Sequence, residues 1–134
     1  MKVRTVRIDA FAGANAVDFE VDGVKAKQSR VKLDKGSGAH KIHFKLHDHT
    51  NRGLRFNEAD PIWVDEDAPC PPSPGVSTDQ LSLTGCTADK ASLVNQNSGR
   101  ARQLRYQLNF IAADGSASEC DPIIENGGGT GGFD

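Results

Sequence analysis

The sequence predicts an all-β domain built as a two-layer antiparallel β-sandwich. Short segments alternate between apolar and polar residues, and turn-forming residues separate them at intervals of roughly 8–12 residues. No segment of ten or more residues places apolar side chains at helical spacing. Because each alternating strand has one apolar face to bury, two sheets packed face to face are the expected arrangement.

The length of the chain fits one domain. It has 134 residues, and a globule of this size can bury an ordinary hydrophobic core without a metal or disulfide as a staple. We assign residues 1–125 to a single sandwich domain. Residues 126–134 are rich in glycine and have little to bury, so we expect a flexible tail there.

The first half of the chain contains a clear hairpin signal. Residues 17–21 alternate between apolar and charged side chains, and Asp22 and Gly23 supply the positive backbone dihedrals of a tight turn before residues 24–27. Other alternating segments predict further strands. Their expected core residues are Val6, Ile8, Ala10, Val31, Leu33, Ile42, Phe44 and Leu46.

The second half continues the pattern of short strands. Residues 62–64 form one segment, and the proline-rich stretch 68–75 is a stiff loop crossing between sheets, because proline lacks an amide donor. Shorter apolar pairs occur at residues 81–83 and 93–94. The last pair of strands is the clearest: residues 104–112 alternate, and a turn at residues 114–115 leads into a closing strand through residue 124.

Residues 104–115 resemble the penultimate strand and final hairpin of immunoglobulin-like and fibronectin-like sandwiches, in which a tyrosine precedes alternating apolar residues, as Tyr106 does here. Trp63 similarly resembles the core tryptophan of those domains, although Leu108 stands where antibody domains have their second cysteine. The resemblance implies an immunoglobulin-like fold and no particular activity, since such sandwiches serve unrelated functions.

The net charge of −2 is unevenly distributed. Residues 1–50 carry ten Lys and Arg against six Asp and Glu, whereas residues 51–134 carry six against twelve. Opposite charges on two copies of the chain favour association. We therefore expect a protein partner or self-association in which arginines of one copy meet acids of the other, the residues being Arg100, Arg102, Arg105, Asp65, Glu66 and Asp67.

Several partner classes are not expected. The basic half lacks the interleaved aromatic residues of a nucleic-acid surface, so its lysines are interpreted as solvated strand faces. No apolar stretch is long enough to cross a membrane, and no signal-peptide core follows Met1, so we expect a cytoplasmic chain. The odd set of Cys70, Cys86 and Cys120 rules out a complete disulfide framework and suits reduced thiols.

All four histidines fall within ten residues. On an extended strand, residues two apart point the same way, so His47 and His49 can present two imidazoles to one ion, with His43 or Asp48 as a third ligand. His40 completes the group, and zinc, nickel or copper would suit such nitrogen ligands. A metal-binding protein is therefore the alternative function, beside a solvated outward face.

Catalytic signatures are missing from the sequence. It contains no Gly-x-Ser-x-Gly elbow and no phosphate-binding glycine loop, and Cys70 lies between prolines rather than at a helix start that would lower its thiol pKa. We therefore expect a protein that is not an enzyme and needs no cofactor. The sequence favours a non-catalytic binding or assembly module.

Overall fold

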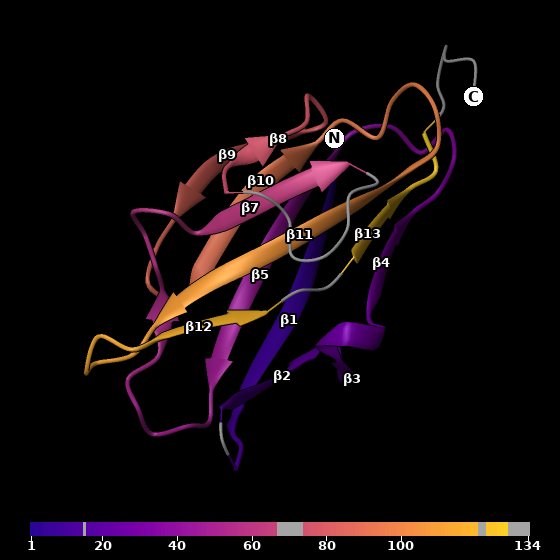
Figure 1. The fold of residues 1–134 in the computed structure, drawn as a ribbon. Helices are drawn as coiled ribbons and strands as arrows, with labels where there is room; N and C mark the ends of the chain where they lie inside the picture. Colours follow the sequence, from indigo (N-terminus) through magenta and orange to yellow (C-terminus); the bar gives the residue numbers. More distant parts are fainter. Residues whose placement is uncertain (15, 67–73, 121–122, 129–134) are drawn as a thin grey trace.

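The computed structural model describes residues 1–14, 16–66, 74–120 and 123–128. These residues form two packed β-sheets (Figure 1), which confirms the predicted all-β sandwich. In the described ranges the one helical element is a short 3₁₀ turn, η1 (Ala26–Gln28), and no helix is long and apolar enough to cross a membrane.

The described strands divide between two sheets. Sheet A contains, from edge to edge, β3 (Val24–Lys25), β2 (Val17–Val21), β1 (Lys2–Ala12), β5 (His40–Asp48), β10 (Lys90–Asn95) and β9 (Leu81–Cys86). Sheet B contains β4 (Arg30–Leu33), β13 (Ile123–Asn126), β11 (Arg102–Ile111), β7 (Ile62–Glu66) and β8 (Val76–Ser77), and β11 also pairs with β6 (Arg55–Phe56) and β12 (Ala117–Cys120).

The strand pairing is mixed, whereas the sequence led us to expect antiparallel pairing throughout. Strand β1 runs parallel to β5, β13 to β4, and β7 to β8. Parallel neighbours require a crossover connection rather than a tight turn. The chain makes this crossover by leaving sheet A after β3, forming β4 in sheet B, and returning to sheet A as β5 beside β1 (Figure 1).

The core lies between the sheets and follows the predicted alternation. Phe44 of β5 packs against Tyr106 of β11 with ring centroids 5.3 Å apart, and both side chains are fully buried. The ring of Phe110 packs against those of Phe19 and Phe56, with ring centroids 5.0 and 4.6 Å apart. The predicted core residues of the first half are all buried, and so are Leu104, Tyr106, Leu108 and Phe110 of the second half. Leu83 is exposed on the edge strand β9.

The predicted hairpin is present. Asp22 and Gly23 have φ of 50° and 81°, the two positive values that a tight two-residue turn needs, and they join β2 to β3. The Asp22 carboxylate also accepts a bond from the backbone N–H of Arg7. Strand β3 ends sooner than predicted, because the chain enters η1 on its way to sheet B.

Trp63 is not a core tryptophan, contrary to the resemblance on which that expectation rested. Ile62 and Val64 are buried, and successive residues of a strand face opposite sides, so Trp63 lies on the outer face of sheet B, half-buried. Its indole N–H donates to Oδ2 of Asp60 at 2.8 Å. Tyr106, the other residue of the resemblance, is fully buried.

The chain between Asn126 and Gly128 belongs to the folded body, so a tail beginning at residue 126 starts too early. The N–H of Gly127 donates to Leu33 O at 2.7 Å, and the N–H of Gly128 donates to Oδ1 of Asn97 at 2.9 Å. The rest of the predicted tail, residues 129–134, and most of the proline-rich loop, residues 68–73, lie outside the described residues.

A buried pair of amides joins the two sheets. Asn126 Nδ2 donates to Asn95 Oδ1, and Asn95 Nδ2 donates to Asn126 Oδ1, both at 2.8 Å. Asn95 belongs to sheet A and Asn126 to sheet B, and each is almost fully buried. Since an unpaired buried amide is costly, this reciprocal contact fixes how the sheets meet at this end.

We predict that Asn126→Leu lowers the free energy of unfolding by about 1–3 kcal/mol, because it leaves the buried Asn95 amide N–H group without an acceptor. Urea denaturation measures the change. Gln96→Leu is the control, since this neighbouring side chain is exposed. Equal stability of the wild type and Asn126→Leu would contradict the assignment.

Candidate functional site

The outer face of sheet A carries a group of cationic side chains. Lys41, His43 and Lys45 alternate with the buried core residues of β5 and therefore point outward. Strand β10 brings two more residues to this face: Lys90 lies opposite Lys45, and Ser92 lies opposite His43. We call these five residues the lysine face.

The three lysines of this face are electrostatically uncompensated. None of Lys41, Lys45 and Lys90 forms an ion pair with another described residue, although arginines elsewhere in the same ranges do so repeatedly. Like charges directly opposite each other on neighbouring strands destabilise a sheet. The Lys45–Lys90 pair therefore opposes folding, and an anion bound to the face would relieve this repulsion.

His43 lies in the middle of the lysine face. Its Nδ1 is 2.7 Å from the Ser92 hydroxyl oxygen. Partial burial lowers the pKa of His43 below its usual value, and the positive charges of Lys90, Lys41 and Lys45 lower it further. The ring is therefore neutral at pH 7, and it contributes a hydrogen-bonding group rather than a charge.

The contact between Ser92 and His43 does not make a hydrolytic dyad. In such a dyad a third group, usually a carboxylate, holds the other ring nitrogen and stabilises the imidazolium. No described carboxylate contacts Nε2 of His43. The lysines surrounding the ring would also disfavour the imidazolium that general-base catalysis must form. The arrangement suits binding better than nucleophilic catalysis.

The predicted metal ligands are not brought together. His43 contacts Ser92, while Nε2 of His49 lies 2.8 Å from Asp9 Oδ1 and its ring stacks on Phe11 at 4.8 Å. His47 faces outward opposite Asp9, beyond Lys45. Within the described part of the chain, no group of three or more His, Cys, Asp or Glu side chains is placed to hold a metal ion.

Asp9 is occupied by its own neighbours. The Arg7 guanidinium donates to both oxygens of its carboxylate, with the shortest contact 2.9 Å from Nε. This contact is the main reason that the pKa of Asp9 lies below its usual value, and His49 adds to the effect. Arg7 and Asp9 therefore neutralise each other beside the lysine face, so they add no net charge to it.

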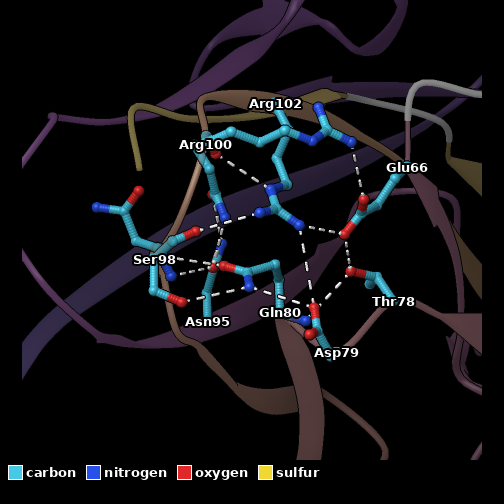
Figure 2. A network of polar contacts seen from close by, with 10 residues as sticks. Glu66, Thr78, Asp79, Gln80, Asn95, Ser98, Arg100 and Arg102 are labelled. Atoms are coloured by element: carbon cyan, nitrogen blue, oxygen red, sulfur yellow. Dashed lines mark hydrogen bonds and ion pairs between the residues drawn. The ribbon is translucent and has the colours of Figure 1, made fainter. Parts of the chain in front are cut away.

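Three of the residues expected at an interface between two copies, Arg100, Arg102 and Glu66, contact one another within one molecule. Figure 2 shows Arg100 and Arg102 on the same carboxylate, that of Glu66, with the shorter contact 2.7 Å from Arg102 Nη1 to Oε1. The Thr78 hydroxyl also donates to Glu66. The Arg102 side chain is only 12% exposed, so this network is a structural contact at the end of the sandwich.

The other three residues of the predicted interface are Arg105, Asp65 and Asp67. Arg105 of β11 lies opposite Asp65 of β7 in the same sheet. Asp67 lies outside the described residues. Glu66 is thus the one acid of the predicted interface for which the described residues show an ion pair with the predicted arginines, and association of two copies stays a prediction.

The lysine face was missed at the level of sequence because two of its members, Lys90 and Ser92, come from a distant strand. Lys41 and Lys45 lie two residues before and after His43, so the alternation alone could have placed all three on the same face of the strand. Lys90 is brought to them only by the pairing of β10 with β5, which no local pattern reveals.

Comparison with known proteins brings no family to this site: no family and no curated protein matches the sequence. Its function must therefore be argued from these residues.

We predict that Glu66→Gln lowers the free energy of unfolding by about 1–3 kcal/mol, because Arg102 loses the ionised acceptor of a half-buried contact. Asp79→Asn is the matched control: it removes the same charge from a side chain that is 87% exposed and lies 3.9 Å from Arg102. Chemical denaturation of both variants tests this, and equal effects would contradict a special role for Glu66.

We predict that Lys90→Gln raises the pKa of His43 toward its usual value, because Lys90 is the strongest of the charges that lower it. The chemical shift of the His43 ring during an NMR pH titration reports the change. Lys27→Gln, an exposed lysine on η1, should leave the His43 midpoint where it is. An unchanged midpoint in Lys90→Gln would show that the lysine does not act on the ring.

Proposed function

We propose that this protein is a non-catalytic binding module whose lysine face docks an acidic segment of a protein partner. One observation carries this proposal: Lys45 and Lys90 lie opposite each other with Lys41 nearby, and none of them has an anionic partner among the described residues. Carboxylates of a partner would replace the repulsion between these lysines by attraction.

The shape and chemistry of the face suit such a partner. Val3 is 64% exposed and lies opposite Lys41 on β1, and Val94 lies opposite Lys41 on β10. Apolar contact therefore adjoins the positive charges. Lysine ammonium groups on flexible stems adapt to carboxylates at varied positions, which favours an acidic polypeptide over a ligand of fixed geometry.

Charge and composition favour a protein over a nucleic acid. The whole chain carries a net charge of −2, and such a molecule repels a long polyanion outside the local basic surface. The lysine face also contains no Phe, Tyr or Trp between its charges, and its one ring, the imidazole of His43, contacts Ser92. A short acidic segment needs only the local attraction.

We also propose an immunoglobulin-like fold for this module, as a statement about its architecture alone. Its support is Tyr106 in the central strand β11, packed across the sheets on Phe44. Such a fold predicts no activity. We also place the module in the cytoplasm, where the thiol of Cys86 would stay reduced.

A fluorescent peptide of glutamate residues tests the proposal directly. We expect saturable binding that weakens as salt is added, and a loss of about tenfold in affinity for Lys45→Gln/Lys90→Gln. The control is Lys25→Gln/Lys27→Gln, which changes the net charge equally at exposed positions near the β3 edge of sheet A, which β2 and β1 separate from β5 and its neighbour β10. Fluorescence anisotropy measures all three proteins.

Two results would overturn the proposal. If both double variants lose affinity equally, binding follows net charge and not the lysine face. If duplex or single-stranded DNA of equal charge binds the face more tightly than the peptide does, the partner is a nucleic acid.

A further inference from the structure

A second cationic feature lies apart from the lysine face, in a groove where the two sheets separate. This groove has a volume of about 440 Å³. Lys2 and Arg4 of β1 line it from sheet A, Lys32 of β4 lines it from sheet B, and Asp34 and His40 complete it. The crossover that sends β4 to the opposite sheet is what brings these residues together.

The charges in the groove are unbalanced. Three cationic side chains face one carboxylate, that of Asp34, giving an excess of two positive charges when His40 is neutral. Lys2 and Lys32 form no ion pair with any described residue. This excess attracts a small oxyanion, and the volume is sufficient for one.

Arg4 is the cationic group with the most unused bonding capacity. Its guanidinium makes one long contact, 3.7 Å from Nη2 to Asp22, and both side chains there are 40% exposed. Its Nε is buried and has no acceptor among the described residues. A guanidinium carries five donor hydrogens in a planar fork that matches the oxygens of an oxyanion, so Arg4 is available to bind one.

The groove also contains hydrogen-bond acceptors. Nδ1 of His40 lies 2.9 Å from the carbonyl oxygen of Gly38, and a carbonyl only accepts, so Nδ1 carries the proton. In the neutral ring Nε2 is then an acceptor, as is the nearby Asp34 carboxylate. Acceptors beside an anion favour one that still carries a hydroxyl proton. Phosphate and phosphomonoesters keep such a proton near pH 6, whereas sulfate does not.

We propose that this groove binds a phosphoryl group, either as free phosphate or as a phosphomonoester on a larger molecule. Arg4 and the two lysines contact its unprotonated oxygens. The Asp34 carboxylate accepts a hydrogen bond from its remaining hydroxyl, as does Nε2 of His40 when the ring is neutral. The proposal does not depend on the function of the lysine face, because none of the five residues of that face lines the groove.

Titrations followed by ¹H–¹⁵N NMR at pH 6 and constant ionic strength test this with inorganic phosphate, sulfate and O-phosphoserine. We expect saturable shifts of residues 2–4, 32–34 and 37–40 with phosphate, and weaker binding of sulfate. Arg4→Gln should weaken phosphate binding about tenfold. Arg30→Gln removes the same charge from β4, where Arg30 pairs with Glu125, and should leave binding unchanged.

Each outcome of the titrations decides the proposal. Saturation with phosphate alone identifies the free ion as ligand, and tighter binding of O-phosphoserine identifies a phosphorylated molecule; both support a phosphoryl site. Equal binding of sulfate, shifts without saturation, or shifts confined to the lysine face would overturn it. Should Arg4→Gln fail to fold, Lys32→Gln, which changes an exposed side chain, replaces it with the same expected loss.

Discussion

The packing of Phe44 against Tyr106 between the sheets determines which side of β5 faces solvent. A strand alternates strictly, so burying Phe44 together with Ile42 and Leu46 forces Lys41, His43 and Lys45 outward. A slip of one residue would bury those three side chains instead. The lysine face is therefore a consequence of the core: the same contact that excludes water from the interior displays the charges on the surface.

The sequence was sufficient for what depends on neighbouring residues. The alternation in residues 40–48 and 102–111, and the Asp22–Gly23 turn, follow from local rules and were predicted. Sequence could not supply which strands become neighbours. The parallel pairing of β1 with β5, and the meeting of Lys45 with Lys90, depend on a crossover between sheets. The resemblance suggested that Trp63 is buried in the core. Its neighbours Ile62 and Val64 point into the core, so the alternation of the strand turns Trp63 to the outer face.

Charge summed over halves of the chain proved a poor guide to electrostatics. The acidic second half contains Glu66, but this carboxylate is shared by Arg100 and Arg102 of the same half (Figure 2). In the basic first half, Arg7 is neutralised by Asp9, while Lys41, Lys45, Lys2 and Lys32 form no ion pair with a described residue. The fold thus pairs its described arginines more often than these four lysines, which fall into two separate places. Binding is expected at those two places because the charge there has no internal counterpart.

The position of β4 has a consequence for how the chain reaches its native state. This strand lies at the edge of sheet B, and its ladder partner is β13, with Arg30 opposite Ile123 in the sequence 93 residues later. Residues 123–126 must therefore be synthesised before the strand that carries Val31 and Leu33 can gain this neighbour, and closing so long a loop is slow. Until then β4 has no ladder partner on that side, so this edge of sheet B is completed late in folding.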